Sequence, residues 1–197
     1  MEQLLELDRN LFIHLNSLHT PWLDPVMMWV TATQAWIPLY LFLIFLIFRT
    51  YGKNGWIIML GVALTILFAD QVTSHWMKPY FARLRPSQDP TLEGIVHIVD
   101  GYRGGRYGFA SSHAANTFGV AFFCWRILRT QYRWIWLLFF WAAAMTYSRI
   151  YLGVHYPGDI LVGLGVGILG AVISLRFTEF LTTRLGKING RGETTEG

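Results

Sequence analysis

The sequence contains a single cysteine and few charged residues. Of its 197 residues, 14% are Asp, Glu, Lys or Arg, well below the roughly one quarter that is usual for a soluble domain. Cys124 alone can form neither an intrachain disulfide nor a cysteine-based metal cluster. Four histidines lack the spacing of metal ligands and are expected to be structural or interfacial: His14, His19, His75 and His97. The composition therefore argues against an ordinary soluble domain and a cysteine metal site.

A basic secretory leader is also missing from the start of the chain. Residues 1–8 are acidic and carry no basic segment before the first apolar residues. The net charge of +4 is modest, and it says more about which loops face the cytoplasm than about nucleic acid. We expect no nucleic-acid partner and no obligate protein partner.

Long apolar runs account for most of the chain, which is 53% hydrophobic. A helix needs about 20 apolar residues to cross the bilayer core. We expect about five membrane-spanning helices, at residues 25–48, 56–77, 113–128, 134–148 and 158–177. Pro38 can kink the first of them.

The N-terminal residues 2–18 show the pattern of a short amphipathic helix. Its apolar face is expected to hold Leu4, Leu5, Leu7, Leu11, Phe12, Leu15 and Leu18. At this length such a helix lies on the membrane rather than across it. The predicted fold class is all-α: a polytopic membrane helix bundle with this interfacial helix. We expect one domain over residues 1–187 and a disordered polar tail at 188–197.

Basic residues gather on the loops of one side of the predicted bundle. They follow the first span, join the third and fourth, and follow the fifth: Arg49, Lys53, Arg126, Arg129, Arg133, Arg176, Arg184, Lys187 and Arg191. By the positive-inside rule this side faces the cytoplasm. The C-terminus is then cytoplasmic, and the loops at 78–112 and 149–157 share the outer side.

The outer loops hold three polar clusters, at residues 78–86, 110–113 and 148–159. Polar and ionisable groups are expensive at a membrane and mark functional sites there. The groups that matter are Lys78, Arg85, Ser111, Ser112, His113, Arg149, His155 and Asp159. Their common side predicts that they form one site.

The third cluster predicts an oriented imidazole. Pro157 cannot continue a helix but can begin one, which places Asp159 in the first turn of the last span. From there the carboxylate can turn back to one ring nitrogen of His155, which would leave the other nitrogen free to attack or to accept a proton.

Together the clusters predict a site for a phosphoryl group. Arginine guanidinium groups suit bidentate binding of phosphate oxygens, and a helix that begins at Ser111 or Ser112 offers free N–H groups to an anion. One imidazole can attack phosphorus while the other protonates the leaving oxygen. Because the cations can stabilise the transition state, this arrangement requires neither a metal nor a cofactor.

The motifs Lys-x6-Arg-Pro, Ser-x-His and Ser-Arg-x5-His-x3-Asp follow one another over residues 78–159. In this order they resemble the type 2 phosphatidic acid phosphatase superfamily, which also contains the vanadium haloperoxidases. The resemblance implies that His155 is a nucleophile that forms a phosphohistidine and that Asp159 orients it. It implies that His113 is the acid for the leaving group and then the base for water.

The resemblance also assigns the phosphate-binding groups. Lys78, Arg85 and Arg149 would bind the phosphoryl oxygens, together with the Ser111 side chain and the backbone amides around Ser112. The family usually has Pro-Ser-Gly-His in the second motif, whereas this chain has Ala-Ser-Ser-His at 110–113. A serine in place of the glycine is tolerated if the position lies in the first helical turn rather than at positive φ.

The resemblance implies a metal-independent hydrolase of a lipid phosphomonoester or diphosphate, and the small size resembles bacterial members of the family. With the basic loops in the cytoplasm, we expect the site of a bacterial inner-membrane protein to face the periplasm. Undecaprenyl diphosphate and lipid A are favoured because both present phosphates on the outer side. Phosphatidylglycerol phosphate and phosphatidic acid are alternatives. A non-catalytic lipid-binding or transport protein on the same scaffold would be expected to lack His113 or His155, and both are present.

Three further features have open interpretations. Asp70 can pair with Lys78 or Arg85 in a structural role. The loop at 100–109 is either a lid over the site or a plain connector. Four glycines in the last span are expected to serve close helix packing: Gly163, Gly165, Gly167 and Gly170.

Overall fold

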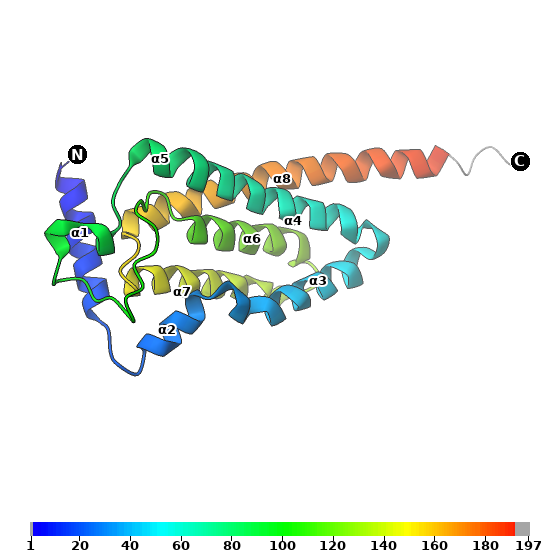
Figure 1. The fold of residues 1–197 in the computed structure, drawn as a ribbon. Helices are drawn as coiled ribbons and strands as arrows, with labels where there is room; N and C mark the ends of the chain where they lie inside the picture. The colour runs from blue at the N-terminus through cyan, green and yellow to red at the C-terminus, as the bar shows by residue number, and fades with distance from the viewer. Residues whose placement is uncertain (1, 192–197) are drawn as a thin grey trace, which may run out of the picture.

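The protein is described here by a computed structural model that covers residues 2–191, and it is built of helices joined by turns and one long loop (Figure 1). The helices are α1 (Glu2–Ser17), α2 (Asp24–Thr31), α3 (Ile37–Tyr51), α4 (Gly55–Asp70), α5 (Lys78–Phe81), α6 (Ser112–Leu128), α7 (Leu138–Tyr151) and α8 (Pro157–Arg191). Within residues 2–191 there is no β-strand, only an isolated bridge between Leu84 and Tyr107. The predicted all-α class is confirmed.

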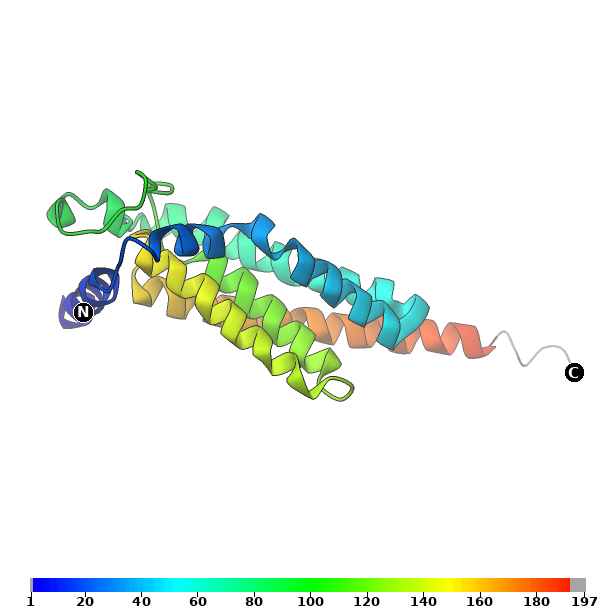
Figure 2. The same ribbon diagram turned by 90° about the horizontal axis from the view of Figure 1, so that it is seen from below.

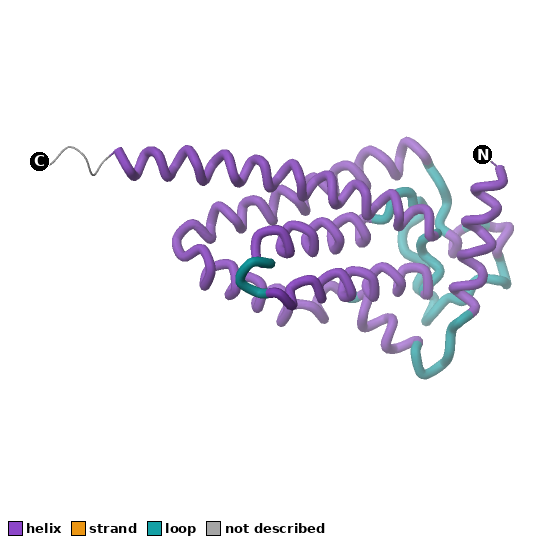
Figure 3. Tube along the Cα trace, turned by 180° about the vertical axis from the view of Figure 1, so that it is seen from behind, coloured by secondary structure: helices purple, strands orange, loops and turns teal. Residues whose placement is uncertain are grey.

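Helices α3, α4, α6, α7 and α8 run side by side as a bundle, and α1 crosses one end of it (Figures 1 and 2). The long loop between α5 and α6 and the α7–α8 connection gather at that same end (Figure 3). The three polar clusters of the sequence therefore lie at one end of the bundle. The core between the helices is apolar and includes Leu46, Phe123, Met145 and Ala171.

Among residues 2–191, two helical stretches are long and apolar enough to cross a membrane, Thr33–Phe81 and Pro157–Arg184. The first stretch is a hairpin in which Gly52–Asn54 turns the chain from α3 into α4. Gly52 adopts φ +52° at the end of α3, a conformation that side chains with a Cβ rarely take.

The first predicted span, 25–48, is interrupted rather than kinked. Helix α2 ends at Thr31, Ala32 is extended, and a short 3₁₀ turn precedes α3. The break precedes Pro38, whose ring lacks an N–H and collides with the carbonyl four residues earlier in a continuous helix. The interruption also leaves Thr31 to accept a hydrogen bond from Arg149 Nη1 at 2.5 Å.

The second predicted span, 56–77, changes its winding before it ends. Helix α4 passes into a π-helical stretch, Gln71–Met77, and then into α5. Such stretches are rare and often occur at functional sites. Here the wider turn carries Thr73 and Ser74, which both contact Ser112 of α6.

Glycines set the crossing of α6 and α8. A Cβ at Gly163 would lie 2.4 Å from the Ser111 carbonyl oxygen, and one at Gly167 would lie 2.1 Å from that of Ala115. A Cβ at Gly170 would meet Phe68 of α4. Gly165 faces open space, so the predicted packing role holds for three of the four glycines and is wrong for Gly165.

Helix α1 has the predicted position in the chain, but its buried face differs from the predicted apolar one. Phe12 and Asn16 are buried. Most of the leucines of the predicted apolar face are exposed instead: Leu4, Leu5, Leu7, Leu11 and, just after the helix, Leu18. The helix therefore attaches to the bundle through a partly polar stripe and leaves its leucine face uncovered within the protein.

At the other end of the chain, α8 continues to Arg191, four residues into the segment predicted as a disordered tail from 188. Once nucleated, a helix without proline extends one residue at a time at little cost. The remaining part of that prediction, residues 192–197, lies outside the described residues.

Candidate active site

His155 lies in the connection between α7 and α8, and both of its ring nitrogens face a partner. Nδ1 is 3.3 Å from Asp159 Oδ2, and Nε2 is 3.3 Å from Arg85 Nη1. The imidazole is 1% exposed and the carboxylate 0%. With the proton on Nδ1, directed at Asp159, the unprotonated Nε2 points toward the cations, which is the arrangement that a nucleophilic histidine requires.

Asp159 is held in place by the start of α8. Pro157 is the first residue of the helix, and the Tyr156 N–H donates to Asp159 Oδ2 at 3.0 Å. Gly108 lies beside the pair, where a Cβ would come within 3.0 Å of Asp159 Oδ2 and 3.5 Å of His155 Nδ1. Glycine at position 108 therefore leaves room for the carboxylate, which a Cβ would crowd.

Burial and positive neighbours keep His155 neutral. Desolvation lowers the pKa of His155 well below its ordinary value, and the charges of Arg85, Arg149 and Lys78 lower it further. A neutral imidazole is the form that can attack phosphorus.

Arg85 is fixed by the long loop. Its Nε donates to the Tyr107 carbonyl at 3.1 Å and its Nη1 to the Val154 carbonyl at 3.3 Å. Gly104 lies so close that a Cβ there would be 2.9 Å from Arg85 Nη1. Burial and the charge of Arg149 lower the pKa of Arg85 to about 10, so the guanidinium is still charged at neutral pH.

Arg149 approaches the same place from the last turn of α7. Its Nη1 donates to Thr31 Oγ1 and, at 3.0 Å, to the Tyr102 hydroxyl. Its Nε is buried without a hydrogen-bond partner within residues 2–191. A buried donor without an acceptor is costly, and a bound phosphoryl oxygen would satisfy it.

The loop at 100–109 is neither a simple connector nor detached from the bundle. Tyr102 contacts Arg149, Tyr107 contacts Arg85, and the Arg103 carbonyl accepts from the Ser87 hydroxyl at 2.8 Å. The loop therefore holds the two arginines that the sequence analysis assigned to phosphate binding.

Lys78 is held by Ser112. Its Nζ donates to Ser112 Oγ at 2.5 Å and to Ser74 Oγ at 3.2 Å. Ser112 begins α6 with helical geometry and is absent from the residues with positive φ, so the serine at the family's usual glycine position is not strained. Its hydroxyl supplies an anchor for the lysine that glycine could not.

Asp70 does not pair with Lys78 or Arg85 as the sequence analysis suggested. Its carboxylate accepts from the Ser74 hydroxyl at 3.0 Å, and the same hydroxyl accepts from Lys78. A serine thus bridges the two charges, because the π-helical stretch places Ser74 between them.

Ser111 is the N-cap of α6. Its Oγ accepts from the Ala114 N–H at 3.4 Å, and its own N–H donates to the Asp159 carbonyl at 2.9 Å. Its hydroxyl is engaged in the cap, and its backbone ties α6 to the start of α8. His113 follows in the first turn, close enough to Arg149, Arg85 and Lys78 for their charges to act on it.

Two charged residues that the sequence analysis did not assign to the site belong to its immediate surroundings. Arg83 donates to Asp159 Oδ1 at 2.8 Å, and its other nitrogen donates to Asp8 Oδ2 of α1 at 2.7 Å. Arg83 lies two residues before Arg85, within the first polar cluster. Nothing in the local sequence links it to residue 8.

The remaining histidines with a described partner are structural. His97 Nε2 lies 2.9 Å from Asp24 Oδ1, and its ring stacks on His19 at 3.7 Å between centroids. Both rings lie beside the α1–α2 connection, so this pair ties the long loop to the N-terminal segment.

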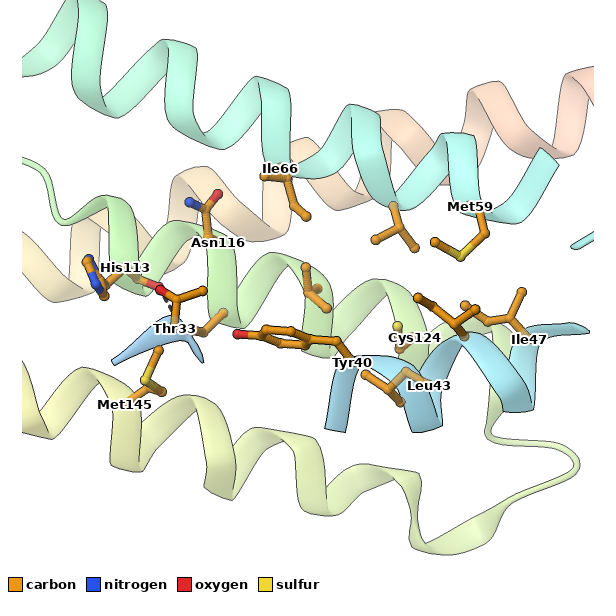
Figure 4. Close-up of a pocket in the computed structure, with 14 residues that line it drawn as sticks. Thr33, Tyr40, Leu43, Ile47, Met59, Ile66, His113, Asn116, Cys124 and Met145 are labelled. Atoms are coloured by element: carbon orange, nitrogen blue, oxygen red, sulfur yellow. Dashed lines mark hydrogen bonds between the residues drawn. The ribbon is translucent and has the colours of Figure 1, made fainter. Parts of the chain in front are cut away.

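An apolar cavity of about 360 Å³ begins at His113 and extends into the bundle (Figure 4). Thr33, Asn116 and Met145 line it near His113, and Ile47, Met59 and Cys124 line its far end. The end of the bundle that holds the polar clusters thus adjoins a space lined mostly by apolar side chains.

Comparison with known proteins identifies the family. The sequence profile described as the PAP2 superfamily matches residues 54–182, a range that contains all three motifs and most of the bundle. The chain belongs to the PAP2 superfamily. The resemblance inferred from the motifs is thereby confirmed.

Two curated relatives and one solved structure show how far the similarity extends. The lipid A 4'-phosphatase of Porphyromonas gingivalis is 41% identical over 86% of this chain and 72% of its own length. The lipid A 4'-phosphatase of Bacteroides thetaiotaomicron is 36% identical over 94% of this chain and 83% of its own. The crystal structure of Aquifex aeolicus LpxE superposes with a TM-score of 0.63 at 26% identity, over 86% of this chain and 95% of that one.

These findings make the chain an integral-membrane lipid phosphatase, a hydrolase of phosphoesters without a metal requirement. Within the described residues, no group of three or more His, Cys, Asp or Glu side chains is placed to hold a metal ion. Three cationic side chains, Lys78, Arg85 and Arg149, lie near enough to His155 for their charges to act on it.

Proposed function

We propose that this PAP2 phosphatase removes a phosphate from a lipid A-type glycolipid at the periplasmic face of a bacterial inner membrane. The observation that carries the chemistry is the position of His155, with Nδ1 at Asp159 and Nε2 at Arg85. The observations that favour the substrate are the two lipid A 4'-phosphatase relatives, both similar over most of this chain.

In the first step, His155 Nε2 attacks phosphorus and the bond between phosphorus and the lipid oxygen breaks. His113 gives its proton to that oxygen. The new P–N bond gives a phosphohistidine whose Nδ1–H still donates a hydrogen bond to Asp159. Lys78, Arg85 and Arg149 bind the phosphoryl oxygens, and the unpartnered Arg149 Nε is the donor that this binding satisfies.

In the second step, His113 takes a proton from a water molecule as the water attacks phosphorus. The P–N bond breaks, inorganic phosphate leaves, and His155 returns to its neutral form. The α6 N-terminus contributes its free N–H groups to the phosphoryl oxygens throughout. The Ser111 hydroxyl serves as the helix cap rather than as a direct ligand.

The cavity next to His113 suits the hydrocarbon part of the substrate. The leaving group must sit beside the acid that protonates it, and the apolar space begins at that residue.

The membrane arrangement follows from the same geometry. We propose that α3, α4, α6, α7 and α8 cross the bilayer and that α1 lies in the outer interface with its leucines toward lipid. The basic loops at the opposite end of the bundle then face the cytoplasm, together with the C-terminus. A reporter fused after Gly197 should be active only in the cytoplasm, and periplasmic activity would reverse this topology.

Phosphate release by purified protein tests the proposal. The assay contains EDTA and compares lipid A phosphates, undecaprenyl diphosphate, phosphatidylglycerol phosphate and phosphatidic acid. Turnover should be highest with lipid A, and His155→Ala should abolish it while leaving the thermal unfolding midpoint unchanged.

Preferential release from undecaprenyl diphosphate would keep the mechanism but replace the substrate. No release from any lipid by folded protein would favour the non-catalytic lipid-binding alternative.

A further inference from the structure

Helix α1 presents three inward residues at intervals of four: Asp8, Phe12 and Asn16. This spacing places them on one face of a helix. Phe12 is fully buried against Tyr156, with ring centroids 5.3 Å apart. Asn16 donates to the Tyr151 carbonyl at 2.8 Å and accepts from the His97 N–H at 2.8 Å. These two contacts fix α1 against the bundle and hold the third residue, Asp8, in a defined place.

Asp8 contacts both the start of α8 and Arg83. One carboxylate oxygen accepts from the Gly158 N–H at 2.7 Å, and the other accepts from Arg83 Nη2 at 2.7 Å. A Cβ at position 158 would lie 2.9 Å from Asp8 Oδ2, so glycine leaves room for the carboxylate. Asp8 is thus anchored to Gly158, the residue immediately before Asp159.

Arg83 is held on three sides. Asp8 and Asp159 bind its two terminal nitrogens, and its guanidinium carbon lies 4.0 Å from the centre of the Tyr156 ring. Tyr156 in turn donates its hydroxyl to Asp89 at 3.2 Å. A guanidinium fixed in this way has one orientation, and that orientation fixes Asp159 Oδ1.

We propose that Asp8 and Arg83 are positioning residues for the phosphatase reaction and act through Asp159 on His155. The proposal rests on the proposed role of His155 as nucleophile. Asp8 holds Arg83, Arg83 holds Asp159 Oδ1, and Asp159 Oδ2 receives the His155 Nδ1–H. The N-terminal helix is thereby part of the catalytic machinery rather than only a membrane contact.

The charges explain why two acids share this arginine. Without Asp8, the Arg83 cation has Asp159 as its one carboxylate partner and turns both nitrogens toward it. The Asp159 carboxylate then moves with Arg83, and the hydrogen bond between Asp159 and His155 lengthens. Displacing an orienting group by a fraction of an ångström is enough to reduce the rate of a chemical step.

Asp8→Asn is the sharpest test, because the amide oxygen can still accept from the Gly158 N–H while the negative charge is lost. Glu6→Gln on the same helix is the matched control, since Glu6 is exposed. We expect Asp8→Asn to lower kcat and the phosphorylation rate of His155 by about 10-fold, with KM unchanged. Asp8→Glu should restore part of the loss, and Glu6→Gln should match the parent protein.

A double-variant cycle distinguishes positioning from general stability. In an Arg83→Gln background Asp8→Asn should have little further effect on kcat, since both changes break the same connection. If the effects of Asp8→Asn and Arg83→Gln on kcat multiply in the double variant, the proposal is overturned. An Asp8→Asn variant as active as Glu6→Gln would overturn it as well. A parent protein without phosphatase activity would instead contradict the proposed function itself.

Discussion

At the scale of single residues, the site depends on side chains that hold other side chains. Lys78 rests on Ser112, Arg85 on backbone carbonyls, and Asp159 on Arg83. In the proposed mechanism, a phosphoryl group that enters the site meets cations that are already oriented. Such preorganisation is the main source of transition-state stabilisation in phosphoryl transfer.

The Ser112 hydroxyl is the most distinctive of these contacts. Ser112→Gly, which restores the family's usual residue, should lower kcat/KM by about 3- to 10-fold, because Lys78 loses a charge-assisted hydrogen bond. Steady-state kinetics with the preferred lipid measures this loss. In a Lys78→Met background the same change should have no effect; an equal loss there would mean that Ser112 acts independently of the lysine.

The depressed pKa of His155 predicts the shape of the pH profile. Because the neutral imidazole is the active form, the acid limb of kcat/KM that belongs to His155 should lie below pH 6.5, the ordinary pKa of histidine. Arg85 is the first of the cations that lower this pKa. Arg85→Gln should therefore raise it and move the limb to higher pH.

Ionisation of the substrate phosphate affects the pH profiles of the parent protein and of Arg85→Gln equally. It therefore does not contribute to the difference between the two profiles. An acid limb that stays in place in Arg85→Gln would show that this cation does not control the nucleophile.

At the scale of helices, the crossing of α6 and α8 determines where the catalytic groups meet. The crossing brings the cap of α6 against the first turn of α8, where the Ser111 N–H donates to the Asp159 carbonyl. His113 and Asp159 are thereby placed on facing helix starts. Glycine at 163 and 167 permits the close approach of the two backbones.

Two glycines on α8 give a matched test of this packing. Gly167→Ala should destabilise the protein by about 1–3 kcal/mol, because the added methyl overlaps the Ala115 carbonyl. Gly165→Ala should be neutral or stabilising by up to about 1 kcal/mol, since its site is open and alanine favours helix. Thermal unfolding in detergent measures both. Equal thermal unfolding midpoints for the two variants would contradict the close contact of α6 and α8 at Gly167.

The sequence predicts these helices well and their interruptions poorly. The apolar runs locate the helices because a membrane span needs length and hydrophobicity alone. The break at residues 32–36 arises from Pro38 and from the contact between Thr31 and Arg149, and the second cause is a tertiary contact invisible in a local pattern.

At the scale of the whole molecule, one end of the bundle holds the candidate site, and an apolar cavity leads from His113 into the interior (Figure 4). This arrangement lets a phosphate stay in a polar site while a hydrocarbon chain stays in an apolar one. The lipid preference of the enzyme should therefore respond to the shape of the cavity.

Val62 of α4 lines the cavity and Leu67 of the same helix is exposed outside it. Val62→Trp should lower kcat/KM for a long-chain lipid phosphate by about 10-fold, because the indole fills space that the chain requires. Leu67→Trp should leave it unchanged, and both variants should hydrolyse p-nitrophenyl phosphate normally. If Val62→Trp lowers kcat/KM equally for the lipid and for p-nitrophenyl phosphate, the cavity does not bind the lipid chain.

The candidate site divides into a part that could be predicted and a part that could not. Spaced motifs with complementary chemistry stand out in an apolar chain, and they predict six residues of the candidate site: His113, His155, Lys78, Arg85, Arg149 and Asp159. Asp8 and Arg83 were missed because their partnership joins residues far apart in sequence. The leucines of α1 give the stronger local signal, and most of them are exposed rather than buried against the bundle.

The central claim is that His155 carries the phosphoryl group during turnover. A rapid-quench experiment with p-nitrophenyl phosphate and the His113→Ala variant tests it most directly. The good leaving group needs no acid, whereas water still needs a base. We predict a burst of nitrophenolate close to one equivalent per site, with acid-labile, base-stable phosphate on His155. Phosphate on another residue, or turnover with no burst and no labelled protein, would contradict the mechanism.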